Sequence, residues 1–161
     1  MKYTFNTLEE VKTAIEKWFI DLGYDNEERA EKQYLKIIAE VGEMADALCK
    51  EDIENFKSEA GDVFVTIVGY CLQTKRNMST DDLDSVVYGK NNLFRNFDLK
   101  NVLRCILDED FNNSLYYLCN VCNLMNTNLL ECATISYNKI QGRLERGELS
   151  VKNGTVIKSG N

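Results

Sequence analysis

Residues 33–48 read QYLKIIAEVGEMADAL, and residues 57–65 read KSEAGDVFV. In the first segment, polar and small residues recur three and four positions apart and so share one face of a helix: Gln33, Lys36, Glu40, Glu43 and Ala47. In the second segment, Glu59 and Asp62 are also three positions apart, and a nearly continuous apolar run follows them. Each segment therefore predicts a helix whose acidic side chains are grouped on one face.

We expect these helices to span residues 27–48 and 53–72. Only the short charged turn 50–52 separates them, which makes them antiparallel neighbours. Their carboxylates then meet at the edge of the core, where uncompensated burial would cost several kcal/mol for each acid. A divalent cation would balance the charge, and an all-oxygen ligand set favours Mg²⁺ first and Mn²⁺ second. The predicted metal ligands are Glu40, Glu43, Glu59 and Asp62.

A simpler interpretation applies to each acidic pair alone. Acids spaced three apart on a helix usually form a solvated face. Two such pairs on adjacent helices, one of them in apolar surroundings, favour the buried site instead. Two alternatives to an enzyme stay open: a non-catalytic nucleotide- or metal-binding regulatory module, and a purely structural helical interaction module.

The rest of the chain predicts an all-α antiparallel helical bundle that forms a single domain over residues 1–161. Further helices are expected over residues 8–22, 99–107, 113–125 and 129–144. Thr7 with Glu10 forms a capping box for the first of them, Gly23 follows its last apolar position, and Thr127 or Asn128 caps the last.

Two segments interrupt this helical pattern. Residues 75–98 are rich in polar clusters, with room for one short helix around residues 83–88, and predict a connector or a substrate-facing insertion. After Gly147 the chain becomes β-prone on either side of Asn153-Gly154, which predicts a short irregular or hairpin C-terminal tail.

Composition excludes several classes of site. The 161 residues include no histidine, which excludes Ser-His-Asp catalysis and His-ligated zinc, and no proline, which permits long helices. The net charge of −7 argues against a nucleic-acid partner. The chain opens on Met1-Lys2 without a cleavable or membrane-spanning apolar segment, so a cytoplasmic protein without a membrane partner is expected.

The six cysteines are expected to be free thiols. The spacing of Cys119 and Cys122 is that of half a zinc site or of a redox pair. Both cysteines follow a helical apolar stripe, however, which favours packing as small hydrophobic residues. Trp18 and Tyr34 can be interpreted as base-stacking aromatics or as core residues, and the stripe that carries Trp18 favours the core.

Residues 33–48 and 57–65 together resemble the signature of the MazG-like all-α nucleoside triphosphate pyrophosphatases, which carry Glu-x-x-Glu and, after a short hairpin, Glu-x-x-Asp. Residues 137–158 are similar to the C-terminal end of phage and bacterial members, whereas residues 76–126 match no motif. The chain departs from the family pattern at Ala39, where a second glutamate is frequent, and at Phe56, where a lysine is usual.

The resemblance implies hydrolysis of a ribo- or deoxyribonucleoside triphosphate between the α and β phosphates, to the monophosphate and pyrophosphate. It also implies a homodimer or homotetramer. Glu40, Glu43, Glu59 and Asp62 would hold Mg²⁺, which activates water and stabilises the leaving group. Glu40 or Glu43 would accept the proton of the attacking water.

Candidate substrate-binding residues lie at both ends of the pattern. Residues 139–161 carry five basic and two acidic side chains, a local charge of +3. We expect the substrate to be bound by Lys36, Gln33, Asn138, Lys139, Arg143, Arg146 and Lys158, with Lys152 nearby. Arg143 and Arg146 can alternatively complement the dipole at a helix end. Asn138 is included because the resemblance suggests contact with the sugar or a phosphate.

Overall fold

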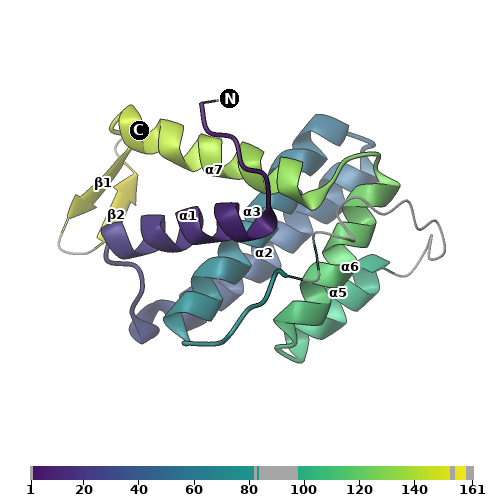
Figure 1. Cartoon of the computed structure of the whole chain (residues 1–161), viewed down its shortest axis with the longest axis horizontal. Coiled ribbons are helices and arrows are strands. Elements are labelled where there is room, and N and C mark those ends of the chain that lie inside the picture. The colour runs from purple at the N-terminus through teal and green to yellow at the C-terminus, as the bar shows by residue number, and fades with distance from the viewer. Residues whose placement is uncertain (1, 82, 84–97, 153–154, 159–161) are drawn as a thin grey trace.

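The structure is a computed structural model that describes residues 2–81, 83, 98–152 and 155–158; the side chains of residue 98 and of residues 149–158 are not described. Helices dominate it, in the order α1 (Leu8–Asp21), the 3₁₀ turn η1 (Glu27–Arg29), α2 (Ala30–Cys49), α3 (Ile53–Gln73), α5 (Asp98–Leu107), α6 (Phe111–Leu124) and α7 (Leu129–Glu145). A short hairpin of β1 (Leu149–Lys152) and β2 (Thr155–Lys158) follows α7 (Figure 1). The predicted all-α class is confirmed.

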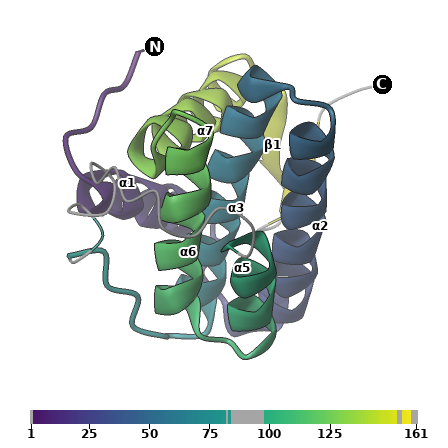
Figure 2. The same ribbon diagram turned by 90° about the vertical axis from the view of Figure 1, so that its right-hand side faces the viewer.

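Helix α3 is the centre of the bundle. It packs against α2, α7, α1 and α6, and Figure 2 shows it surrounded by these helices. Its side chains are buried almost continuously from Val63 to Cys71, as the apolar run predicted. Helices α5 and α6 form a second hairpin, in which Phe111 of α6 contacts Tyr70 of α3 with ring centroids 5.3 Å apart. Helix α3 therefore positions the four helices that pack against it.

Local capping sets the helix boundaries close to those predicted. The Thr7 hydroxyl accepts from the Glu10 amide at 3.1 Å, and α1 ends in a Schellman turn in which Gly23 has a φ of +67°. Asp52 caps α3 through the amide of Asn55. Of the two cap candidates for α7, Asn128 accepts from the amide of Glu131 at 2.8 Å. Short-range hydrogen bonds thus explain why the sequence predicted these ends.

The C-terminal tail forms the predicted hairpin. Strands β1 and β2 pair antiparallel, with Leu149 opposite Lys158 and Lys152 opposite Thr155. The predicted turn at Asn153-Gly154 lies outside the described residues. So does the predicted short helix around residues 83–88, except for Leu83, which is buried.

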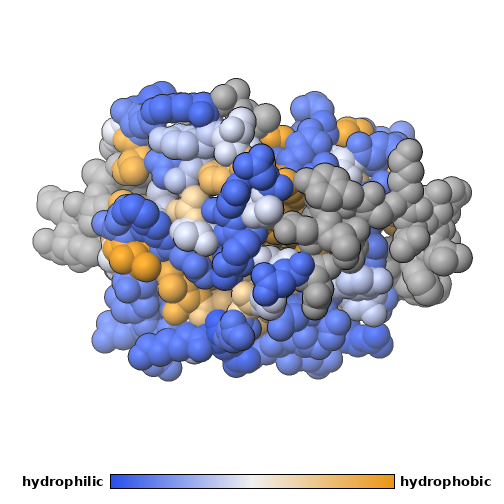
Figure 3. All heavy atoms as spheres, in the orientation of Figure 1, coloured by the Kyte–Doolittle hydropathy of each residue, from blue (hydrophilic) through white to orange (hydrophobic). Residues whose placement is uncertain are grey.

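All six cysteines are free thiols, as predicted; Cys49 is exposed and the other five are buried. Cys119 and Cys122 pack in the core beside Leu118. Burial raises the pKa of the Cys71 thiol to about 12, which keeps it protonated near neutral pH. No helix within the described part of the chain is both long and apolar enough to cross a bilayer. The face in Figure 3 is mostly hydrophilic, with smaller apolar areas between the polar side chains.

Helices α3 and α7 are closely packed at Gly61. A Cβ atom at this position would collide with the backbone carbonyl of Cys132 and the hydroxyl of Ser136. The Ser136 hydroxyl also donates to the Ser58 carbonyl at 2.9 Å, so a side chain of α7 is bonded to the backbone of α3 at the crossing. Glycine is therefore required at residue 61 to bring α7 against α3.

Substitution of Gly61 by alanine is expected to lower the free energy of unfolding by about 1–3 kcal/mol, because the added methyl group meets backbone that cannot move aside. The matched control is Gly42→Ala on α2, where an added Cβ meets nothing within 4 Å. There alanine is expected to be neutral or to stabilise by up to about 1 kcal/mol, because it favours the helix. Urea unfolding measures both, and equal stability of the two variants would contradict the close crossing.

Candidate functional site

Three carboxylates converge where α2 packs on α3. One side-chain oxygen from each of Glu40, Glu43 and Glu59 lies within 4.8 Å of the other two. Glu40 and Glu59 are buried, at 7% and 8% exposure, while Glu43 is exposed. The helical spacing of Glu40 and Glu43 and the antiparallel hairpin produce this arrangement. Three of the four predicted acids are therefore brought together at the edge of the core.

The charges of these acids are only partly balanced by neighbouring side chains. Lys36 donates to Glu40 at 2.7 Å, and this hydrogen bond raises the pKa of Lys36. Burial raises the pKa of the Glu59 carboxyl, and the nearby charges of Asp62, Glu43 and Glu40 raise it further, while Lys139 opposes the rise. The ionised form of Glu59 is therefore unfavourable in this position unless a positive charge lies near its carboxylate.

The fourth predicted acid has a different environment. Asp62 is not among the three converging carboxylates; it accepts from Lys139 of α7 at 2.5 Å. Lys139 also donates to the Ser58 hydroxyl at 3.0 Å, which ties this lysine to two successive turns of α3. The pairing of Lys139 with Asp62 was not foreseen, because it depends on the crossing of helices that are far apart in the sequence.

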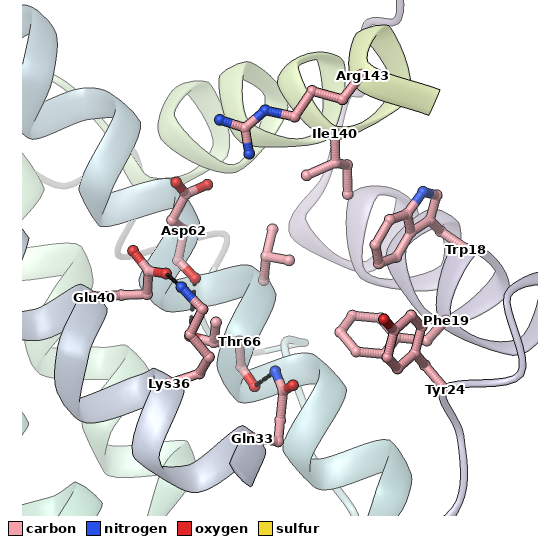
Figure 4. A pocket seen from close by; sticks show the side chains of 11 residues that line it. Trp18, Phe19, Tyr24, Gln33, Lys36, Glu40, Asp62, Thr66, Ile140 and Arg143 are labelled. Atoms are coloured by element: carbon pink, nitrogen blue, oxygen red, sulfur yellow. Dashed lines mark hydrogen bonds and ion pairs between the residues drawn. The ribbon is translucent and has the colours of Figure 1, made fainter. Parts of the chain in front are cut away.

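A pocket of about 320 Å³ opens beside the acids. Its walls come from four helices, α1, α2, α3 and α7, and from Tyr24, which follows α1. The lining residues are Trp18, Phe19, Tyr24, Gln33, Lys36, Glu40, Asp62, Val65, Thr66, Ile140 and Arg143. Figure 4 shows Glu40, Lys36 and Asp62 on one side and the three aromatic side chains on the other. None of the described lining residues belongs to α5 or α6. The pocket thus has one charged side and one aromatic side.

The aromatic side of the pocket changes the interpretation of Trp18. This residue was expected in the core; it packs against the core but is only partly buried and also lines the pocket. Trp18 and Tyr24 lie nearly parallel, with ring centroids 6.4 Å apart and planes at 6°. Phe19 and Tyr24 were missed, because on the sequence Phe19 is one more member of an apolar stripe and Tyr24 only follows a helix end.

Tyr34, the other aromatic considered, lies outside this pocket. Its hydroxyl donates to the carbonyl of Ile106 at 3.1 Å, and its ring contacts Tyr70. These contacts attach the α5–α6 hairpin to the α2–α3 hairpin and give Tyr34 a structural role.

The predicted substrate-binding residues are distributed unequally. Gln33, Lys36 and Arg143 line the pocket, and in Figure 4 the guanidinium of Arg143 extends from α7 toward the side that holds Asp62. The Gln33 amide nitrogen donates to the Thr66 carbonyl at 3.0 Å. The hydroxyl-bearing Thr66 is a further lining residue that the helical pattern of α3 did not distinguish from its apolar neighbours.

The remaining predicted substrate-binding residues either lie away from the pocket or have side chains that the structure does not describe. The Asn138 side chain accepts from the amides of Lys2 and Tyr3 and donates to the Tyr3 carbonyl, each at 2.9 Å. It therefore attaches the N-terminal segment to α7, and a contact with substrate stays a prediction. Arg146 is exposed and pairs with Glu148. The side chains of Lys152 and Lys158 are not described.

The converging acids fit a hard divalent cation. Carboxylate oxygens are the ligands that Mg²⁺ and Mn²⁺ prefer, and no thiol or imidazole competes in this set. Within the described residues, no side chain donates a hydrogen bond to Glu59 or Glu43, so the negative charge exceeds what Lys36 supplies. A buried excess of this kind is what a bound cation would neutralise.

Comparison with known families is consistent with this geometry. Residues 28–92 match the family model of the MazG nucleotide pyrophosphohydrolase domain. The chain carries a MazG-like domain. The match covers less than half of the chain but contains all four acidic residues of the two motifs. The matched model describes a nucleotide pyrophosphohydrolase domain, which supports nucleotide pyrophosphohydrolase activity in general. No curated protein and no solved structure matched the chain.

Substitution of Glu59 by glutamine is expected to raise the melting temperature of the cation-free protein at pH 7. The pKa of Glu59 is raised in the folded state, so its ionised form destabilises the fold above that pKa, and glutamine removes the charge while keeping the shape. The same variant should lose most of the stabilisation that Mg²⁺ or Mn²⁺ gives the wild type.

Differential scanning fluorimetry with and without the cation measures both effects. Glu54→Gln is the matched control, because this exposed acid of α3 pairs only with Lys57 among the described residues and should respond like the wild type. A Glu59→Gln variant that keeps the full cation response would show that Glu59 is not a ligand.

Proposed function

We propose that the protein hydrolyses a nucleoside triphosphate between its α and β phosphates, in the presence of Mg²⁺ or Mn²⁺, and releases the monophosphate and pyrophosphate. The observation that carries this proposal is the convergence of Glu40, Glu43 and Glu59 beside a pocket with charged and aromatic sides. The match to a nucleotide pyrophosphohydrolase family supports the same reaction class.

The acids would hold the cation, with Asp62 as the fourth acid in reach of the same pocket. A divalent cation bound here supplies positive charge to the phosphate oxygens and lowers the pKa of water. Glu43 is the candidate general base, because it is exposed and no described side chain donates to it, whereas Glu40 is engaged by Lys36. Glu59, buried on α3, would fix the cation against the core.

Basic residues on two helices would bind the triphosphate. Lys36 of α2 and Arg143 of α7 both line the pocket, from opposite sides in Figure 4. A guanidinium and an ammonium in this arrangement donate charge-assisted hydrogen bonds to phosphate oxygens. We place the phosphates between them, next to the acids.

The aromatic side of the pocket would receive the nucleoside. Trp18, Phe19 and Tyr24 offer apolar rings opposite the acids, and stacking of a base on an aromatic side chain is worth about 1–3 kcal/mol. The orientation follows from chemistry, because the phosphates require the cationic side. Selection of the base would then depend on Trp18 and Phe19 of α1 and on Tyr24, which follows this helix.

The test is product analysis with a panel of ribo- and deoxyribonucleoside triphosphates and Mg²⁺. We expect the monophosphate and pyrophosphate in equal amounts, resolved by anion-exchange chromatography, and no turnover when the cation is chelated. Formation of the diphosphate and orthophosphate would show that a different bond is broken. Cation-dependent nucleotide binding without turnover would favour the regulatory module.

Inorganic triphosphate tests the nucleoside end of the pocket in the same assay. It carries the phosphates without a base, so it should compete with the preferred nucleotide only at concentrations about tenfold or more above the KM. If inorganic triphosphate competed as strongly as the nucleotide itself, the aromatic side chains would not contribute to nucleotide binding.

A further inference from the structure

The contact between Lys139 and Asp62 joins α7 to α3 and is less exposed than the Lys17–Asp21 pair on the surface of α1. The Asp62 side chain is 17% exposed and the Lys139 side chain 30%, whereas Lys17 and Asp21 on α1 are 73% and 56% exposed. The ammonium group lies 2.5 Å from Asp62 and 3.0 Å from the Ser58 hydroxyl. A lysine with two partners in a half-buried position has a defined place beside the acids.

The backbone determines this place. Lys139 follows Ser136 by one helical turn, and the Ser136 hydroxyl is bonded to the Ser58 carbonyl where α7 crosses α3. Gly61 allows that crossing, since any larger residue would meet the backbone of Cys132. The ammonium group is thus delivered to Asp62 by the packing of two helices, not by a chance surface contact.

Asp62 pairs with Lys139 and lies outside the converging set of acids. It shares a helix face with Glu59, three residues earlier, yet the converging set contains Glu59 without Asp62. Lys139 supplies Asp62 with a positive charge, as Lys36 does for Glu40. A second positive charge at the acids would compete with Lys139 for the same carboxylate.

Lys139 is not itself one of the described residues that line the pocket, but it is adjacent to two that do, Asp62 and Arg143. Arg143, which lines the pocket, is four residues further along α7 and therefore on the same helix face. Asp62 lines the pocket as well, so an ammonium group released from Asp62 is already within the region assigned to the triphosphate. It would then donate to phosphate oxygens from the same face as Arg143.

We propose that Lys139 is a stand-in cation that holds Asp62 in the ligand-free enzyme and moves its hydrogen bonds to the triphosphate when nucleotide and divalent cation bind together. This inference rests on the proposed function. Lys139 opposes binding of the cation alone, because it occupies Asp62, and favours binding of the cation–nucleotide complex, because a phosphate replaces the carboxylate as its acceptor. The enzyme thereby binds the cation–nucleotide complex in preference to the cation alone.

The test uses Lys139→Met in the full chain, with two titrations by isothermal calorimetry. For Mn²⁺ alone the variant is expected to bind about fivefold more tightly than the wild type. For Mn²⁺ with the α,β-methylene analogue of the preferred triphosphate, it is expected to bind about tenfold more weakly. A lysine that only stabilises the fold would not change the two affinities in opposite directions.

Two further variants control the experiment. Lys57→Met removes an ammonium group of α3 itself, which pairs with Glu54 of α3 and Glu131 of α7, and should leave both affinities unchanged. Lys139→Arg keeps the charge and should keep both affinities within about twofold of the wild type. A change of affinity in Lys57→Met would reveal a general effect of removing a lysine or of altered folding. A change in Lys139→Arg would show that the positive charge at residue 139 does not explain the affinities.

The outcomes separate this inference from the proposed function. If Lys139→Met weakens both affinities, or leaves Mn²⁺ binding unchanged while the wild type binds Mn²⁺, the stand-in role is wrong and the proposed function is unaffected. If the wild type binds neither Mn²⁺ nor the analogue, the proposed site and the stand-in role are both wrong.

Discussion

Repulsion among carboxylates at the α2–α3 interface is the constraint on which the rest of the structure depends. Glu40 and Glu59 are buried within 4.8 Å of each other's oxygens and of Glu43, a placement that a fold would not keep without compensation. Lys36 and Lys139 supply part of the missing charge from the flanks. The remaining deficit is the physical reason to expect a divalent cation in this position.

The bundle serves to hold this interface in a fixed geometry. Helix α3 is buried along its apolar run and contacts four other helices, so Glu59 and Asp62 stand on a helix that is held by packing from several directions. Gly61, placed between them, brings α7 close enough for Lys139 to reach Asp62. Helix α1 adds the aromatic side of the pocket from the opposite direction. The segment of α3 that packs against its neighbours is therefore the same segment that carries the acidic side chains of the site.

Much of this arrangement follows from local sequence signals. The acidic faces of α2 and α3 were predicted because helical periodicity and a short turn decide which side chains meet. Capping residues such as Thr7 and Asn128 have partners within three residues, which makes helix ends readable from the sequence. The hairpin tail was likewise predicted from residues that lie next to one another.

Features that depend on distant contacts were not predictable in this way. Lys139 and Asp62 are 77 positions apart, and their pairing depends on where α7 crosses α3. Trp18 has the sequence pattern of a core residue, and only the position of α1 beside α2 and α3 makes it part of a pocket wall. Asn138 was selected by resemblance, but its amide is bonded to the N-terminal segment, which no local signal indicates.

The most direct test of the central claim is a crystal structure of the protein grown with Mn²⁺, with diffraction data collected above the manganese absorption edge. The account predicts an anomalous difference peak among the carboxylates of Glu40, Glu43 and Glu59, at the charged side of the pocket. Absence of a peak there in crystals that contain Mn²⁺ elsewhere, or a direct lysine pairing of all three acids, would contradict it.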